Sequence, residues 1–372
     1  MKFVEDNLNW IHSANHPSCD KVRYAELAFN ILREGNSVRF STKSPELLGN
    51  EEFRILQPKT RVFSTGGTSG KPKSVFHNED SLASAVRMLI DRVGEEPYNT
   101  FCCLPLNHVS GWMQVERAIR SKGTVLFGNY RDLLDKEFRK LIQKCWISLV
   151  PTQFELLSKS TNALSNLRES RGVLIGGSRL SSKLEEIAQN EDIPLNPCYG
   201  MSETAGLITL LESHNFLNRK RGVGDCLKNV KIKIVENQIQ LRSPSLCYGV
   251  DGNRCKNNTW FKTNDLGKYI PGTGYNIMGR IDRCIITGGE KVFPELVERL
   301  ITEYPSVDQC FLHGEEDSFW GQKVVVYLVM NQASKLKHIQ KETKKKLLSY
   351  EFPKEWRVVD QLPLCDLGKK KI

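Results

Sequence analysis

The chain has 372 residues, of which 40% are hydrophobic and 26% are charged, and its formal net charge is +10. This composition excludes a disordered or low-complexity chain, and the length suits two domains better than one core. No stretch approaches the eighteen or so apolar residues of a membrane span, and residues 1–6 do not resemble a signal peptide, so we expect a cytoplasmic protein.

The eleven cysteines are scattered and never occur as Cys-x-x-Cys, which favours reduced thiols over disulfides or a metal centre. His12, His16 and Cys19 have a spacing that resembles a metal site, but Pro17 argues against one helical face. The basic clusters at 219–221, 344–346 and 369–371 are short and far apart. The positive charge is therefore compatible with small polyanions and does not require nucleic acid.

The first two-thirds of the chain alternate between strand and helix patterns. Residues 1–58 are expected to be helical and connecting material, with apolar residues at helical spacing over 24–32. Short apolar runs then predict buried strands at 100–104, 123–127, 146–150 and 173–175. Helical patterns at 80–92 and 136–144 lie between them. This alternation predicts a layered α/β domain with a largely parallel sheet.

The pattern of apolar and polar residues changes after residue 230. Alternating segments at 231–235 and 238–242 predict a small β-rich subdomain. From Asp282 onward the pattern predicts a helix, two strands and a lysine-rich helix, at 294–304, 309–313, 323–330 and then 341–346. This is an α+β unit of about ninety residues, near the lower end of domain sizes. We therefore expect two domains, residues 1–281 and residues 282–372.

Residues 64–73 form a loop rich in glycine and hydroxyl groups that ends in two lysines. Glycines allow successive backbone N–H groups to point at one anion, and the hydroxyls and lysines add donors and charge. A Walker A loop is excluded because Pro72 follows Lys71 where a Ser or Thr must stand. The segment therefore predicts a different phosphate-binding loop.

Further motifs follow in a fixed order. They are Leu104-Pro105-Leu106-Asn107-His108-Val109-Ser110-Gly111, Gly176-Gly177-Ser178, Tyr199-Gly200-Met201-Ser202-Glu203-Thr204, Lys262-Thr263-Asn264-Asp265, Gly279-Arg280-Ile281-Asp282, Gly288-Gly289-Glu290 and, near the end, Leu362-Pro363 with Gly368-Lys369. With the glycine loop, this series resembles the adenylate-forming superfamily of acyl-CoA synthetases. Segments 148–153, 173–177 and 279–298 most resemble the o-succinylbenzoate:CoA ligases of menaquinone and phylloquinone biosynthesis.

The resemblance implies an ATP-dependent ligase that joins a small acid to coenzyme A through an acyl-AMP, with Mg²⁺ as cofactor. A ligase for another aromatic or medium-chain acid, and a non-catalytic nucleotide-binding protein, are the alternatives. In the family the glycine loop lies much further into the chain than residue 64. A shortened N-terminal part is therefore expected, and with it a monomer or a homodimer. No nucleic-acid partner is expected.

The resemblance also implies roles for individual residues. Asp265 would accept hydrogen bonds from the ribose, Glu203 would help to hold Mg²⁺, and Tyr199 would stack on adenine beside Gly176 and Gly177. The residues expected to bind ATP are Ser64, Thr65, Gly66, Gly67, Thr68, Ser69, Gly70, Lys73, Gly176, Gly177, Ser178, Tyr199, Gly200, Met201, Ser202, Thr204, Asp265 and Arg280.

Three residues are expected to be catalytic, namely His108 at the mouth of the acyl pocket, Glu203 and Lys369. His108, Gln153 and Ser178 are expected to contact the acid. Asp282 falls at the family's hinge, so the resemblance implies that the C-terminal domain moves and carries Lys369 into the site. Asn264 replaces the glycine that usually precedes the ribose-binding aspartate, and Asn tolerates the same backbone conformations better than most residues.

Overall fold

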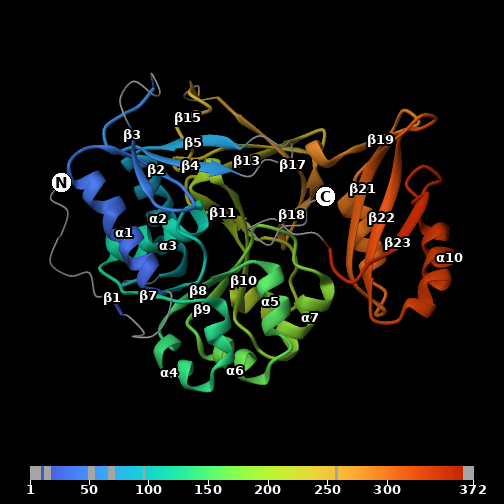
Figure 1. Cartoon of the computed structure of the whole chain (residues 1–372), viewed down its shortest axis with the longest axis horizontal. Coiled ribbons are helices and arrows are strands. Elements are labelled where there is room, and N and C mark those ends of the chain that lie inside the picture. The colour runs from blue at the N-terminus through green and yellow to red at the C-terminus, as the bar shows by residue number, and fades with distance from the viewer. Residues whose placement is uncertain are drawn as a thin grey trace.

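The computed structural model describes residues 10–11, 18–48, 55–65, 72–94, 97–255 and 259–362. It is a mixed α/β structure in which two sheets and their helices form the larger part (Figure 1). The last third of the chain adds a small antiparallel sheet and then a separate α+β unit, which is orange to red and lies at one side of the molecule (Figure 1). The expected fold class, a layered α/β part with a β-rich subdomain and a C-terminal α+β unit, is confirmed.

The largest sheet has eight strands and is parallel from β1 to β10. In sheet order the strands are β1 (Trp10–Ile11), β7 (Val125–Phe127), β6 (Thr100–Cys102), β8 (Trp146–Leu149), β9 (Gly172–Ile175), β10 (Leu195–Met201), β11 (Gly206–Leu210) and β12 (Asp225–Cys226). Strands β6 to β9 are buried along their whole length, as expected where helices cover both faces of a parallel sheet. The predicted strands and their parallel arrangement are confirmed.

Helices accompany these strands along the chain. They are α1 (Ser18–Arg33), α2 (Glu79–Val93), α3 (Val109–Ser121), α4 (Arg139–Ile142), α5 (Pro151–Leu157), α6 (Thr161–Glu169), α7 (Ser182–Asn190) and α8 (Ser213–Leu217). The Asn78 side chain caps the start of α2, and Gly94, with φ of 64°, ends it. Within the described ranges, no helix is both long and apolar enough to cross a bilayer.

The helix predicted over 136–144 is wrong in its extent. A 3₁₀ turn, Lys136–Phe138, precedes the single turn of α4. The Asp135 side chain caps that 3₁₀ turn, and the Trp146 N–H already donates to the Asn99 carbonyl to begin β8. The residues after α4 are therefore paired in the sheet, which leaves no room for a longer helix.

A second sheet of six strands lies beside the first. In sheet order its strands are β16 (Asn253–Arg254), β15 (Gly249–Val250), β5 (Lys73–His77), β4 (Arg61–Thr65), β2 (Ser37–Phe40) and β3 (Pro45–Leu48). The expectation that residues 1–58 are helical and connecting material is therefore wrong for the residues of β2 and β3. Strand β2 pairs with β4 in parallel, and Phe40 stacks on Phe63 with ring centroids 4.5 Å apart. These partners are distant in sequence, so local patterning does not reveal them.

The predicted β-rich subdomain is an antiparallel sheet of four strands. They are β13 (Lys231–Val235), β14 (Gln238–Arg242), β17 (Phe261–Ile270) and β18 (Gly274–Arg280). Glu236 and Asn237, with φ of 50° and 64°, form the tight turn between β13 and β14. Two positive φ values in a two-residue hairpin match the right-handed twist of the strands.

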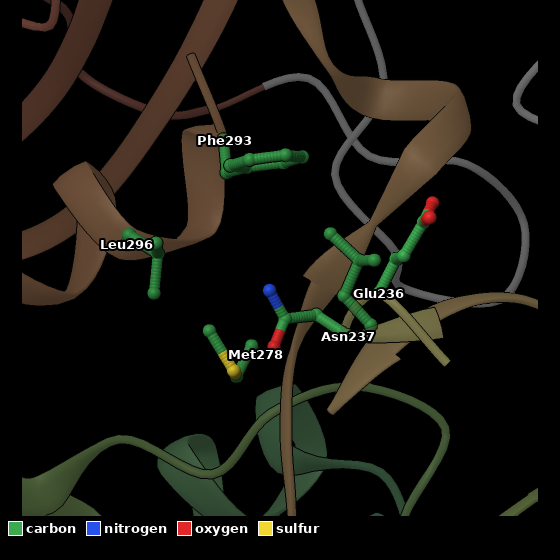
Figure 2. Close-up of a pocket in the computed structure, with 6 residues that line it drawn as sticks. Glu236, Asn237, Met278, Phe293 and Leu296 are labelled. Carbon is green, nitrogen blue, oxygen red and sulfur yellow. The ribbon is translucent and has the colours of Figure 1, made fainter. Parts of the chain in front are cut away.

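The C-terminal unit packs a helix of high amphipathicity onto a five-stranded sheet. Its elements are β19 (Ile285–Thr287), β20 (Glu290–Val292), α9 (Pro294–Thr302), β21 (Val307–Asp317), β22 (Gly321–Met330), α10 (Leu336–Lys346) and β23 (Glu355–Val358). Helix α9 also faces the β-rich subdomain. A cavity of about 60 Å³ separates Phe293 and Leu296 from Asn237 and Met278 (Figure 2). Room for a few waters remains at this junction, so it is packed less closely than a core.

Candidate functional site

The glycine loop joins two antiparallel strands of the second sheet. Ser64 and Thr65 end β4, Lys73 begins β5, and Thr65 pairs with Lys73. Ser64 and Lys73 are exposed. Gly66, Gly67, Thr68, Ser69 and Gly70 lie outside the described residues. The two ends of the glycine loop are therefore held next to each other as paired strand residues.

Four of the predicted site segments lie at one edge of the parallel sheet. His108 follows β6, Gln153 follows β8, Gly176 to Ser178 follow β9, and Tyr199 to Met201 form the end of β10. Since these strands are parallel, their carboxyl ends meet at the same edge. Ligands of open α/β sheets bind at this edge, so the fold gathers the predicted residues where a site is expected.

Tyr199, Asp265 and Arg280 form one hydrogen-bonded group. The Tyr199 hydroxyl donates to Asp265 Oδ2 over 2.7 Å, and Arg280 Nη1 donates to Asp265 Oδ1 over 3.0 Å. Asp265 and Arg280 are cross-strand partners in β17 and β18. Tyr199 and Asp265 are 8% and 6% exposed, and burial together with the nearby carboxylate raises the pKa of Tyr199. The phenol therefore stays protonated and can donate to Asp265.

Glu203 is presented by a tight turn after β10. A bulge between Tyr199 and Gly200 leads into a 3₁₀ turn, Ser202–Thr204, and Thr204 Oγ1 accepts from the Met201 N–H. A Cβ at Gly200 would lie 2.0 Å from the Gly206 carbonyl oxygen, so only glycine fits there. The Glu203 side chain remains half-exposed while its backbone carbonyl accepts from Cys247.

Gly176 and Gly177 have distinct local reasons for being glycine. A Cβ at Gly176 would lie 2.9 Å from Cys198 Sγ, and Gly177 has φ of 83°. Ser178 is exposed beside them. The backbone after β9 therefore approaches β10 more closely than any residue with a side chain allows.

His108 and Gln153 begin helices at the same edge. The His108 carbonyl accepts from the Gly111 and Trp112 N–H groups at the start of α3, and its side chain is half-buried. Gln153 Oε1 accepts from the Val150 N–H over 3.2 Å and so caps α5. This bond fixes the Gln153 side chain, and its amide N–H groups are the donors that an acid's carboxylate could accept from. Lys369 lies outside the described residues.

Arg117 was not among the predicted residues. This α3 side chain is 5% exposed, and its guanidinium lies 3.7 Å from where a Cβ at Gly206 would be. Burial raises the pKa of the Cys198 thiol, and the nearby positive charge of Arg117 partly opposes that rise. Its Nε is buried without a hydrogen-bond partner, and no residue of the described ranges forms an ion pair with it. In the sequence, Glu116-Arg117 looks like surface charge on a helix, so only the fold reveals a buried unpaired cation.

His77 links the second sheet to the Glu203 turn. It lies on β5, is fully buried, and its Nε2 donates to the Ser202 carbonyl over 2.7 Å, while Nδ1 contacts Ser81 Oγ over 3.1 Å. A carbonyl can only accept, which fixes the donor as Nε2. Burial lowers the pKa of His77 from 6.5 to about 4. The imidazole is therefore neutral at neutral pH.

This lowered pKa predicts a pH-dependent stability. Between pH 6.5 and 4 the unfolded chain binds a proton at His77 that the folded chain does not, so the free energy of unfolding falls as pH falls through this window. A shift of this size corresponds to about 3 kcal/mol. Gln at position 77 retains an N–H for the Ser202 carbonyl but does not titrate. The free energy of unfolding, measured with denaturant at several pH values, should therefore depend less on pH in His77→Gln than in the parent chain. The same dependence on pH in both proteins would contradict a lowered pKa of His77.

Two protein-family models match this chain, one in each of its parts. The family model of the AMP-binding enzymes matches residues 55–246, and the model of the AMP-binding enzyme C-terminal domain matches residues 296–369. The chain belongs to the AMP-binding enzyme family. The first match covers β4, β5 and β10, and the second covers most of the C-terminal unit, while β17 and β18, which carry Asp265 and Arg280, lie between the two matches.

The relatives of this AMP-binding enzyme include named ligases. It is 30% identical over 338 residues to the 2-succinylbenzoate–CoA ligase of Listeria monocytogenes, covering 88% of this chain and 71% of the relative. The Bacillus subtilis ligase of the same name is 27% identical over 337 residues. The solved o-succinylbenzoate CoA synthetase of Bacillus subtilis with the acyl-adenylate OSB-AMP has a TM-score of 0.72 at 25% identity, over 83% of this chain and 67% of that one. The same enzyme with ATP and magnesium has a TM-score of 0.71 at 27% identity.

Proposed function

We propose that this chain is an AMP-forming acid:CoA ligase that converts o-succinylbenzoate to o-succinylbenzoyl-CoA. In the first half-reaction the succinyl carboxylate attacks the α-phosphate of ATP and pyrophosphate leaves. In the second, the thiol of coenzyme A displaces AMP from the acyl-AMP. The relatives support this assignment, and so does the gathering of the family's motif residues at one edge of the parallel sheet.

The proposed acid substrate is chosen on the basis of the buried guanidinium of Arg117. An unpaired buried cation is costly, and it is normally found where a ligand supplies the missing anion. o-Succinylbenzoate has a second carboxylate that does not react. We infer that this carboxylate binds Arg117, with Gly206 leaving space in front of the guanidinium. A monocarboxylic aromatic or medium-chain acid would leave Arg117 uncompensated.

The remaining residues suit the handling of ATP. The glycine loop between β4 and β5 would hold the phosphates, and Asp265, fixed by Tyr199 and Arg280, has lone pairs left to accept from the ribose hydroxyls. The same hydrogen bond fixes the Tyr199 ring, and Tyr199 follows Cys198, the β10 residue that Gly176 approaches, so adenine would enter between them. His108 would border the acid. These positions pre-arrange charge and donors before reaction, which is the main source of catalysis for this chemistry.

Glu203 fits a magnesium ion that arrives with the nucleotide. No group of three or more His, Cys, Asp or Glu side chains converges within the described ranges, so the chain offers no enclosed metal cage there. Mg²⁺ is typically held by one or two carboxylates with water and phosphate oxygens, and a single half-exposed Glu203 suits that set. When bound, the ion would neutralise phosphate charge.

We infer a domain boundary at Asp282, giving residues 1–281 and a mobile unit of residues 282–372. Asp282 accepts two hydrogen bonds from Arg280, which is held by Asp265 of the larger part. The next residue, Arg283, instead pairs with Glu295 and Glu298 of α9. Residue 282 is thus hydrogen-bonded to the larger part, whereas residue 283 forms ion pairs within the C-terminal unit. The loosely packed junction beside α9 (Figure 2) suits movement there.

The test is release of pyrophosphate and AMP across a panel of acids, measured with ATP, Mg²⁺ and coenzyme A. We expect o-succinylbenzoate to give the highest kcat/KM, benzoate and medium-chain acids to be poor, and 3-benzoylpropionate, which lacks only the second carboxylate, to lose most of the rate. Strong release with a monocarboxylic acid and none with o-succinylbenzoate would overturn the substrate. ATP binding without pyrophosphate exchange for any acid would favour a non-catalytic protein. We further expect a cytoplasmic monomer or homodimer, which light scattering and cell fractionation test.

A further inference from the structure

Two cysteines that the proposed reaction does not use lie in contact behind Glu203. Cys247 follows β14, Cys255 follows β16, and their Sγ atoms are 3.9 Å apart with both thiols free. Cys247 is 2% exposed, whereas Cys255 is half-buried and so can be reached from solvent. No third ligand joins them to form a metal site within the described ranges. Two adjacent thiols with one reachable member have the arrangement of a dithiol that can be oxidised.

The segment that bears these thiols is bonded directly to the candidate site. The Cys247 N–H donates to the Glu203 carbonyl over 2.7 Å, and the Tyr248 N–H donates to the Phe76 carbonyl of β5 over 3.0 Å. Asp251, at the turn, exchanges two hydrogen bonds with Ser74, each of 2.8 Å. A change in this hairpin is therefore transmitted to the turn of Glu203 and to the strand that leaves the glycine loop.

We propose that Cys247 and Cys255 form a reversible intrachain disulfide, which makes this hairpin a redox modification site. A disulfide bond is about 2.05 Å long, so the two sulfur atoms must approach each other by almost 2 Å. Since Cys247 is buried and bonded to Glu203, that approach pulls on the Glu203 turn. The oxidised chain should consequently hold its nucleotide and metal less well.

The exposure of the two thiols assigns their roles. Cys255 is half-buried and can meet an oxidant from solvent, whereas Cys247 is 2% exposed. Thiolates are the attacking species in exchange, and access decides which of the two reacts first. The buried cysteine, whose Sγ lies 3.9 Å from that of Cys255, is placed to resolve the intermediate.

The oxidant is a low-molecular-weight disulfide, with oxidised glutathione as the probe. The Cys255 thiolate attacks one sulfur of glutathione disulfide, that S–S bond breaks, and one glutathione leaves as a thiolate that takes a proton. Cys247 then loses its proton and attacks Cys255 Sγ, and the second glutathione leaves. Two protein thiols are oxidised to one disulfide, and one glutathione disulfide is reduced to two thiols.

The experiment treats the whole purified chain with oxidised glutathione, blocks the remaining thiols and digests it with trypsin. Trypsin cleaves after Arg254, so Cys247 and Cys255 fall on separate peptides that only a disulfide joins. We expect the joined peptide by mass spectrometry and its loss after reduction. Cys247→Ser should accumulate the mixed disulfide at Cys255, Cys255→Ser should leave Cys247 unmodified, and Cys284→Ser, which removes another half-buried thiol, should behave as the parent chain.

Free thiols at both positions, or a glutathione adduct on Cys255 that persists while Cys247 is intact, would overturn the disulfide. Its effect on Glu203 rests on the proposed function and is measured separately. Pyrophosphate exchange should fall on oxidation and return on reduction, and Cys255→Ser should not respond. Unchanged exchange in fully oxidised protein would overturn the coupling to Glu203. An inactive reduced enzyme would instead count against the proposed function, because the joined peptide does not depend on activity.

Discussion

Lys369→Ala is expected to slow formation of the acyl-AMP by about three powers of ten, the size of effect seen when a donor to transition-state charge is removed. The proposed role of this lysine is to contact both the attacking carboxylate and the α-phosphate, where negative charge grows. Single-turnover formation of acyl-AMP, without coenzyme A, measures this step. Lys370→Ala and Lys371→Ala are matched controls, since they remove the same charge from neighbouring positions, and both should retain nearly full activity.

The second half-reaction should respond differently to the same substitution. If residues 282–372 rotate after adenylation, Lys369 leaves the site, and the surface of Gly288 to Lys291 faces the incoming thiol instead. Thioester formation from prepared acyl-AMP and coenzyme A should then be nearly unaffected in Lys369→Ala. Equal losses in both half-reactions, on protein shown to be folded, would contradict movement of the C-terminal unit.

Replacing Arg117 by Met should raise the KM for o-succinylbenzoate by roughly a hundredfold, because truncating one partner of a buried charge pair costs about 3 kcal/mol. The KM of a monocarboxylic acid should stay the same or fall, since the variant no longer buries an unpaired cation beside it. Steady-state kinetics with both acids gives the comparison. A uniform loss for both acids would contradict a contact between Arg117 and the second carboxylate.

The stability of Arg117→Met separates this role from a structural one. In the absence of substrate Arg117 has no ion pair in the described ranges, so an apolar side chain of similar length should leave the melting temperature unchanged or raise it. Arg120→Met is the contrasting variant, because Arg120 forms ion pairs with Glu79 and Glu116, each with N–O distances below 3 Å. Its loss should lower the melting temperature without changing the preference between acids.

The sequence predicts the parallel sheet well because that information is local. Runs such as Trp146–Leu149 are apolar at three of four positions, and all four residues are buried, as expected for a strand covered on both faces. The motif at Tyr199 and the aspartate at 265 are both predicted to lie in the site, and the hydrogen bond between them agrees with that placement. The sequence assigns them separate partners, adenine and ribose, and cannot show that they also hold each other.

What the sequence misses depends on contacts between distant segments. Strand β2 pairs with β4 on one side and with β3 on the other, and Arg117 differs from an ordinary surface arginine only through what surrounds it in the fold. The contact of Cys247 with Cys255 is local by comparison, but it depends on the pairing of β15 with β16, strands of only two residues each that the sequence pattern does not predict. Spacing rules such as Cys-x-x-Cys do not detect such a pair.

The six-stranded sheet also has a consequence for synthesis of the chain. Strand β5 is made early, but β15, the strand that covers its free edge, follows much later, and the bond between Thr60 and Tyr248 spans 188 residues. At ribosomal speeds of about 5 to 20 residues per second, this delay is roughly ten to forty seconds. During that time the edge of β5 is open to other strands, including those of neighbouring nascent chains. Slowing translation between residues 77 and 249 should therefore increase aggregation of the newly made enzyme.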